Sequence, residues 1–248
     1  MTAGPRIIVV GASSGLGRTI GIGIGLAGRG ARVALLARRK ERLDQAAIEA
    51  GNGAIAVTCD VTGQDSCQAA IAEAAAALGG IDALVYSTGK IAVAPLEDVD
   101  AATWADLFAT NVTGAALTTA AALPHLAAAR GVAVYLSSIS ASLTPPWPKI
   151  GSYVTTKAAL DKLVEAWRAE HPHVRFTRLA LGDCAGGDGH NATEFINSAD
   201  PELITAAIND WIAMGYMTGN LIDPSELVQV LDTVIRCGSA IPSVTLAP

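Results

Sequence analysis

Aromatic and charged residues are scarce in this sequence, and long hydrophobic runs are absent. Of its 248 residues, 4% are aromatic and 16% are charged, whereas 51% are hydrophobic. No stretch of about 18 or more apolar residues runs without a charge or a glycine, so we expect no membrane-spanning helix and no membrane partner. The first residues also lack the long apolar segment of a secretory signal peptide.

Cysteine is equally rare, and its spacing argues against two kinds of site. The four cysteines are Cys59, Cys67, Cys184 and Cys237, and no two of them form a CxxC pair. They do not group with the four histidines either, so we expect no metal site and no disulfide framework, as in a cytoplasmic protein. A net charge of −6 argues against nucleic acid as a partner.

What the sequence does contain is an alternation of short apolar runs and helical patterns. Strands are predicted at Ile7–Val10, Arg32–Ala37, Ala54–Thr58, Ala83–Tyr86, Val132–Leu136, Arg175–Leu181 and Val244–Leu246. Helices are predicted at Leu16–Ala27, Arg39–Ala50, Gln64–Leu78, Thr103–Arg130, Ser152–Glu170 and Pro224–Arg236. Apolar runs without polar alternation are typical of parallel strands buried on both faces. The pattern therefore predicts one α/β domain, residues 1–248, built on a doubly wound parallel sheet of about seven strands, the Rossmann fold.

Two segments depart from this rhythm. The first predicted helix carries Gly21, Gly23 and Gly25. Each costs roughly 1 kcal/mol relative to alanine inside a helix, so close packing against the sheet or a cofactor would explain them. Residues 182–223 form a long irregular stretch with one short predicted helix, Pro201–Met214. A segment of that length inside a domain is typical of a lid or a substrate-binding loop.

The first strand leads directly into a glycine-rich turn and a helix. Glycines there allow the backbone to approach a pyrophosphate closely, and the N–H groups at the helix start bind its oxygens. The turn therefore predicts a dinucleotide site. Its expected ligands are Gly11, Ser13, Ser14, Gly15, Leu16 and Gly17.

The GxxxGxG spacing of this turn resembles the short-chain dehydrogenase/reductase (SDR) family, and so do motifs along nearly the whole chain. The matching residues are Asp60-Val61 after the third strand, Asn111 in ATNVTG, Ser138 at the end of the fifth strand, and Tyr153 and Lys157 in YVTTK. Two turns differ from the family, because Tyr86-Ser-Thr-Gly89 replaces Asn-Asn-Ala-Gly and Leu181-Gly182 replaces Pro-Gly. The resemblance implies that the cofactor is also contacted by Asp60, Val61, Thr88 and Gly89.

The end of the second strand bears on the choice of cofactor. An NAD-binding protein normally has an acid there that holds the ribose 2′-hydroxyl, but this sequence has Ala37 followed by Arg38 and Arg39. An arginine pairs with a 2′-phosphate, so the sequence favours NADP(H), with Arg38 the first-choice ligand and Arg39 the second. NAD(H) remains the alternative.

Tyr153 and Lys157 lie four residues apart on a predicted helix and therefore project from one face. We expect the lysine to lower the pKa of Tyr153, which then exchanges a proton with an alcohol or a carbonyl. Ser138 would orient the substrate oxygen. Ser138 lies farther from Tyr153 along the sequence than is usual in the family, and the family's usual gap would select Ser140 instead. Both serines therefore remain candidates for this role. The resemblance further implies that Lys157 bonds the nicotinamide ribose and that Asn111 holds a water of a proton relay.

The resemblance implies an enzyme, namely an NADP(H)-dependent alcohol dehydrogenase or ketoreductase acting on a small alcohol or carbonyl compound. It also implies a homodimer or homotetramer, formed through the long alanine-rich helices. A non-catalytic dinucleotide-binding sensor is the alternative, in view of the two altered turns. Four apolar residues could line the substrate pocket, and these are Trp147, Phe195, Trp211 and Met214.

Overall fold

A single parallel sheet forms the centre of the protein. The computed structural model describes residues 4–22, 25–185 and 200–248. Within them, seven strands pair in the order β3-β2-β1-β4-β5-β6-β7, every pair parallel. The strands are β1 (Arg6–Val10), β2 (Arg32–Ala37), β3 (Ile55–Thr58), β4 (Ala83–Tyr86), β5 (Val132–Ser138), β6 (Arg175–Leu181) and β7 (Ser243–Leu246). This order confirms the predicted doubly wound architecture.

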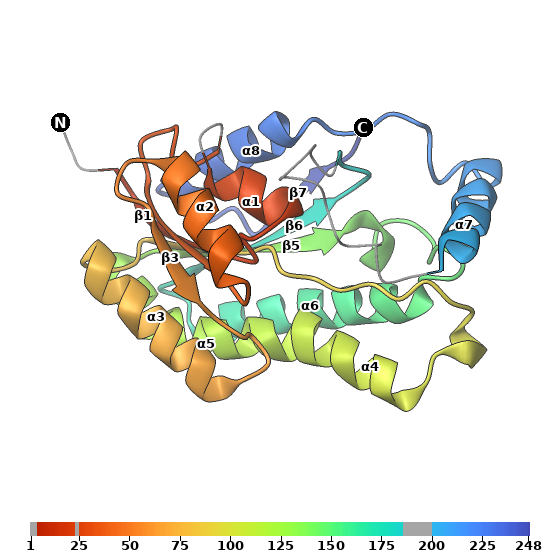
Figure 1. Cartoon of the computed structure of the whole chain (residues 1–248), viewed down its shortest axis with the longest axis horizontal. Helices are drawn as coiled ribbons and strands as arrows, with labels where there is room; N and C mark the ends of the chain where they lie inside the picture. Colours follow the sequence, from red (N-terminus) through yellow and green to blue (C-terminus); the bar gives the residue numbers. More distant parts are fainter. Residues whose placement is uncertain (1–3, 23–24, 186–199) are drawn as a thin grey trace.

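Helices cover both faces of the sheet (Figure 1). One face carries α1 (Gly15–Gly21), α2 (Lys40–Ala50) and α8 (Pro224–Arg236). The other face carries α3 (Gln64–Leu78), α5 (Gly114–Ala129) and α6 (Gly151–Glu170). Each face therefore has its own hydrophobic core.

The central strand β1 explains why the sequence runs are apolar without alternation. Ile7 and Val9 are fully buried against the helices of one face, whereas Ile8 and Val10 are fully buried against those of the other. Side chains of a strand alternate between faces, so a strand with helices on both sides needs an apolar residue at every position.

Helix α1 is shorter than predicted, because it ends at Gly21 instead of reaching Ala27. Ile22 has extended backbone angles, φ −89° and ψ −167°. A Cβ on Gly21 would lie 2.4 Å from Cδ2 of Leu35 on β2, so this glycine lets the helix pack closely on the sheet. The glycines that follow lower the helix propensity at the point where the prediction extended it.

The predicted helix Thr103–Arg130 is interrupted in its middle. The structure has α4 (Ala101–Phe108), a π-helical turn η2 (Ala109–Thr113) and then α5. A π turn inserts one residue into the helix and shifts the side chains that follow, and such turns are frequent at functional sites. Asn111 lies in this turn and is fully buried.

The C-terminal part of the predicted substrate loop contains one helix, α7 (Pro201–Ala213), close to the predicted Pro201–Met214. Asp200 caps it by accepting a hydrogen bond from the N–H of Glu202 at 2.9 Å. Residues 186–199 of the loop, including Phe195, lie outside the described residues. Two short 3-10 turns complete the elements, η1 (Leu96–Asp98) and η3 (Ile139–Ala141).

The strand order determines where a ligand can bind. The chain proceeds outward from β1 to β3, returns, and adds β4 on the other side of β1. Loops that follow β1 and β4 therefore diverge and leave a crevice at the carboxyl ends of the strands. The glycine turn follows β1, and Thr88 and Gly89 follow β4.

Candidate active site

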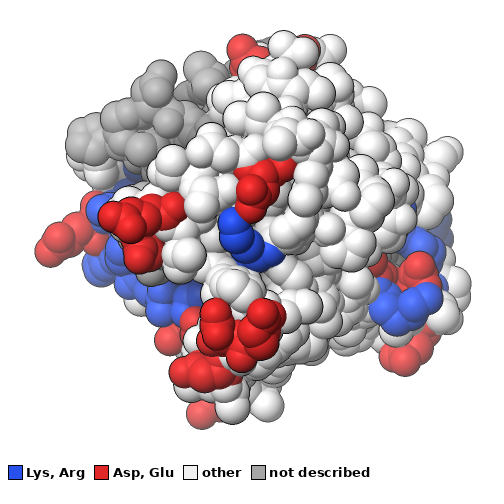
Figure 2. Space-filling view, turned by 90° about the vertical axis from the view of Figure 1, so that its right-hand side faces the viewer, with Lys and Arg blue, Asp and Glu red and all other residues white. Residues whose placement is uncertain are grey.

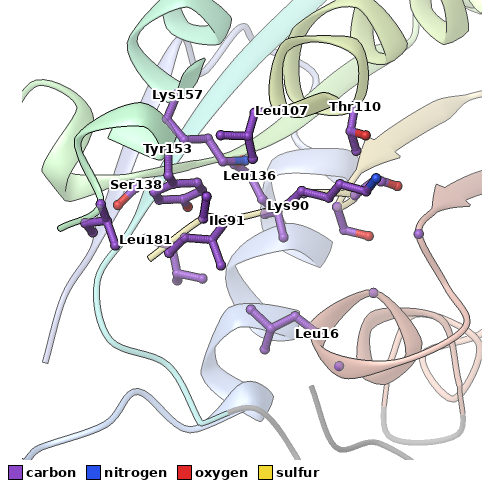
Figure 3. A pocket seen from close by; sticks show the side chains of 18 of the residues that line it. Leu16, Lys90, Ile91, Leu107, Thr110, Leu136, Ser138, Tyr153, Lys157 and Leu181 are labelled. Carbon is purple, nitrogen blue, oxygen red and sulfur yellow. The ribbon is translucent and has the colours of Figure 1, made fainter. Parts of the chain in front are cut away.

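A cleft of about 1190 Å³ lies at this crevice. Its wall contains every residue that the sequence predicted to contact the cofactor, from Gly11 in the turn to Lys157 on α6. Ser138 also lines the cleft, whereas Asn111 lies behind the wall. Figure 3 shows Ser138, Tyr153 and Lys157 together on one side, with Leu16 of α1 across the cleft.

The glycine turn has the shape that a pyrophosphate requires. Gly11 has a φ of +92°, and a Cβ at this position would lie 2.6 Å from Oγ1 of Thr88. A Cβ on Gly17 would lie 2.3 Å from the carbonyl oxygen of Gly11. A side chain at either position would collide with these atoms, so both glycines are needed for the tight turn, and the residues present fit a dinucleotide.

The start of α1 leaves hydrogen-bond donors available to a phosphate. The side chain of Ser14, the residue before α1, does not cap the helix N–H groups. The Ser13 and Ser14 hydroxyls instead each accept a hydrogen bond from Nη2 of Arg39 at 2.9 Å. The free N–H groups and the positive end of the helix dipole therefore face the cleft.

Two arginines lie beside this turn at the end of β2. Arg39 is half-buried through its bonds to the serines, while Arg38 is exposed, and both line the cleft. The Arg38 charge also helps to keep the pKa of Asp60 below its usual range, although the larger cause is the hydrogen bonds that Asp60 accepts from Thr62. Arginines, serine hydroxyls and helix N–H groups thus form one anion-binding corner.

The altered turn after β4 keeps its attachment to the sheet by other means. Ser87 stands at the second asparagine of the family pattern, and both its N–H and its hydroxyl donate to the carbonyl of Val10, at 3.0 and 2.5 Å. Oγ1 of Thr88 is buried and has no hydrogen-bond partner among the described residues. A ligand in the cleft can supply that partner, because Thr88 lines it.

Helix α6 brings Tyr153 and Lys157 to the cleft. Tyr153 is 9% exposed and Lys157 4% exposed. Nζ of Lys157 lies 5.7 Å from the centre of the Tyr153 ring and donates a hydrogen bond to the carbonyl of Leu136 at 2.8 Å. Burial lowers the pKa of Lys157 to about 8, although the nearby carboxylate of Asp161 counteracts this shift.

The expectation that the pKa of Tyr153 is lowered is wrong. Burial raises the pKa of Tyr153 well above its ordinary value, and a hydrogen bond with Ser138 offsets only part of this rise. Desolvation of the phenolate dominates because α6 packs the ring into the wall of the cleft. The hydroxyl therefore carries its proton at neutral pH.

The geometry separates the two candidate serines. Ser138 is the hydrogen-bond partner of Tyr153. Ser140 is 3% exposed, and its hydroxyl lies 2.8 Å from that of Ser138. Both serines line the cleft, but Ser138 is the one that is bonded both to Tyr153 and to the other serine. The arrangement favours Ser138 at the substrate oxygen, with Ser140 orienting it.

Asn111 acts on the site through other residues. Its Oδ1 accepts from the N–H of Lys90 at 2.7 Å, and its Nδ2 donates to the carbonyl of Lys90 at 2.9 Å and to Oγ1 of Thr156 at 2.8 Å. Thr156 in turn donates to the carbonyl of Tyr153. Asn111 thus fastens the loop after β4 to helix α6, which is a positioning role; the relay water stays a prediction.

The far end of the cleft is apolar. Trp147 and Trp211 line it as predicted, but Met214 is 53% exposed and absent from the wall, where Met217 stands instead. The α7 helix ends at Ala213, so Met214 lies one position beyond the helix that carries Trp211. Sequence reasoning missed Lys90 and Asp183, which also line the cleft, because no motif includes them.

Fold and cleft together define a dinucleotide-binding protein of the doubly wound α/β class. Comparison with known proteins makes this more specific. A family model described as short chain dehydrogenase matches residues 5–192. The chain is 35% identical over 172 residues to 11-beta-hydroxysteroid dehydrogenase 1A of Arabidopsis thaliana, covering 67% of this chain and 48% of that protein. It is 32% identical over 232 residues to gluconate 5-dehydrogenase of Gluconobacter oxydans, covering 91% and 85%.

A solved structure has the same fold over nearly the whole length of this chain. A dehydrogenase/reductase from Sinorhizobium meliloti 1021 superimposes with a TM-score of 0.81 at 27% identity, covering 99% of this chain and 94% of that one. The chain belongs to the short-chain dehydrogenase family. It spans about half the length of the plant hydroxysteroid dehydrogenase that it matches.

Proposed function

We propose that the protein is an oxidoreductase that interconverts a small carbonyl compound and its alcohol with NADP(H). The observation that carries the proposal is the convergence of Ser138, Tyr153 and Lys157 in the cleft that also contains the glycine turn. The names of its relatives, which are dehydrogenases of hydroxysteroids and of gluconate, support the reaction class.

Each of the three side chains has a separate role in the proposed carbonyl reduction. The bound nicotinamide would supply the hydride. Ser138 donates a hydrogen bond to the carbonyl oxygen and holds it near the hydroxyl of Tyr153. Tyr153 keeps its proton at neutral pH because burial raises its pKa, so it is ready to give that proton to the oxygen as negative charge develops. Lys157, still largely protonated at pH 7, faces the ring and stabilises the resulting phenolate.

The preference for NADP(H) over NAD(H) rests on the anion-binding corner. Arg38 and Arg39 line the cleft at the end of β2 and would pair with a 2′-phosphate, and Ala37 supplies no carboxylate to repel it. Arg39 is already held by Ser13 and Ser14, so less of its side-chain entropy is lost on binding.

Replacing either arginine with alanine should weaken binding of NADPH by about 1–3 kcal/mol, roughly 5- to 150-fold, because one charge-assisted hydrogen bond is lost. Binding of NADH should change much less. Lys40→Ala is the matched control, since Lys40 pairs with Asp44 on α2 and does not line the cleft. Calorimetric titration of both cofactors measures the effect. Equal losses for NADH and NADPH would contradict the assignment.

The two serines give a second test. Ser138→Ala should lower kcat by about 10²-fold, the usual cost of one donor to a developing oxyanion. Ser140→Ala should cost clearly less, because Ser140 acts only by orienting Ser138. A larger loss in Ser140→Ala than in Ser138→Ala, measured with the same ketone and cofactor, would transfer the catalytic role to Ser140.

A panel of ketones and aldehydes, assayed with NADPH and with NADH by the loss of reduced-nicotinamide absorbance, tests the proposed function. Reduction of at least one carbonyl compound, faster with NADPH, is the expected result. Tight cofactor binding without turnover across the panel would favour the alternative, a dinucleotide-binding sensor.

Assembly and location are proposed on separate grounds. The helical run Ala101–Ala129 is the one stretch of the described chain long and apolar enough to cross a membrane, by length and composition alone. It packs against α3 and α6, so we propose that its exposed apolar surface meets a second copy in a homodimer or homotetramer instead. The four unpaired cysteines support a cytoplasmic location.

A further inference from the structure

Charge is distributed one-sidedly along the part of the chain that bounds the substrate end of the cleft. Between Arg178 and Arg236 the sequence has nine Asp and Glu residues and neither Lys nor Arg. The stretch runs from β6 through α7 into α8, and within its described residues the end of β6, the residues just after it, and α7 with its flanking residues line the cleft. Figure 2, which faces the side where α7 lies, shows a mostly uncharged surface with small acidic groups and a few basic ones, one of which lies beside an acidic group near the centre.

The cations that line the cleft either lie at the end of β2, beside the glycine turn, or are already bonded to other groups of the protein. All 17 Lys and Arg residues fall within the described ranges, and four of them line the cleft. Arg38 and Arg39 lie at the end of β2, beside the glycine turn. Nζ of Lys90 lies 2.6 Å from Oδ1 of Asp106, and Lys157 is bonded to a main-chain carbonyl of β5. A negatively charged substrate would therefore find only Lys157 near Tyr153, and that ammonium group already faces the ring and donates to a carbonyl.

Asp183 adds an opposing charge. It follows β6 directly, lines the cleft, and is fixed by its carbonyl, which accepts from the N–H of Ile222 at 2.9 Å. Burial raises the pKa of its carboxyl group, and no ion pair joins it to a Lys or Arg in the described chain. A second anion beside a poorly solvated carboxylate is strongly disfavoured.

The remaining wall at this end is large and apolar. It is formed by Ile91, Trp147, Ile150, Ile204, Ile208 and Trp211. Most of these belong to the hydrophobic cluster that includes Tyr153, and the rings of Trp147 and Trp211 lie 5.4 Å apart. Flat aromatic and branched aliphatic side chains of this kind favour ring-sized apolar ligands.

We propose that the substrate is an uncharged, ring-sized apolar ketone or alcohol, and that the cleft discriminates against substrates that carry a carboxylate or a phosphate. The proposal rests on the proposed function and specifies its substrate class. It separates this chain from its relative named for gluconate, a carboxylate, with which it shares 32% identity.

Two ketones that share one aromatic frame test the proposal, namely methyl 4-acetylbenzoate, which is neutral, and 4-acetylbenzoate, which lacks the ester methyl group and carries a negative charge. Each is titrated calorimetrically into the protein saturated with NADP⁺, so that no reduction takes place. The ester should bind at least tenfold more tightly than the carboxylate. Equal or tighter binding of the carboxylate, or no measurable binding of the ester, would overturn the proposal.

A pair of variants locates the source of the discrimination. Asp183→Asn should reduce the ester-to-carboxylate ratio at least threefold, because it removes the repelling charge and keeps the shape. Glu202→Gln removes an exposed acid of the same stretch that does not line the cleft, so it should leave the ratio unchanged. An unchanged ratio in Asp183→Asn would contradict the role of that carboxylate.

The outcomes separate this inference from the proposed function. Reduction of carboxylated ketones in preference to neutral ones would support the proposed function and contradict the inference about substrate charge. Selective binding of the ester without reduction of any carbonyl compound by either cofactor would support the inferred selectivity and contradict the proposed function.

Discussion

Tyr153→Phe should abolish most of the turnover while leaving the fold and cofactor binding nearly intact. The substitution removes one hydroxyl and keeps the ring that packs beside Trp147 and Ile150. General acid catalysis typically contributes about 10²- to 10⁴-fold, so kcat should fall by that factor or more. Steady-state reduction of any ketone found in the panel, together with calorimetric titration of NADPH, measures both effects.

Tyr216→Phe is the matched control for this loss. It also removes a hydroxyl from the aromatic cluster, because Tyr216 stacks on Trp147 with ring centres 5.7 Å apart, but Tyr216 does not line the cleft. Its turnover should match the wild type. Full activity in Tyr153→Phe would show that another group supplies the proton, and the mechanism would then be wrong.

The fold could be predicted from the sequence because its signals are local. Buried strands such as Ala83–Tyr86 and capped helices such as Pro224–Arg236 have the observed bounds. The glycine turn could also be predicted, since glycines between a strand and a helix allow a tight turn and the close approach of a phosphate. The C-terminal end of α1 could not be predicted, because Gly21 is required by a close contact with Leu35 on another element, β2.

Properties that depend on packing could not be predicted in the same way. The π turn at Asn111 places an asparagine against Lys90 and Thr156, and no periodicity reveals that placement. The pKa of Tyr153 was expected to fall through Lys157, a neighbour visible in the sequence. The opposite shift comes from burial, which only the assembled cleft determines.

The same burial makes Lys157 costly to the folded protein. Lys157→Met should lower turnover at least 10²-fold, because the charge facing Tyr153 is lost, and yet should stabilise the protein. Burial depresses the pKa of Lys157 from 10.5 to about 8, which at about 1.4 kcal/mol for each unit disfavours the charged folded state by about 3 kcal/mol. Loss of the hydrogen bond to the Leu136 carbonyl costs the variant about 1 kcal/mol of stability. The free energy of unfolding should therefore rise by a net amount of about 2 kcal/mol.

The pH dependence of this gain identifies its cause. A lysine with a depressed folded pKa destabilises the protein fully below pH 8, and the destabilisation is relieved as the pH rises to 10.5, where the unfolded chain also loses the proton. The stability difference between Lys157→Met and the wild type should therefore shrink across that window in urea unfolding of the cofactor-free protein. Lys162→Met, an exposed position on the same helix, should change stability by no more than about 0.5 kcal/mol at any pH. A gain that persists unchanged above pH 10 would come from packing of the methionine, and the buried charge would then not be its source.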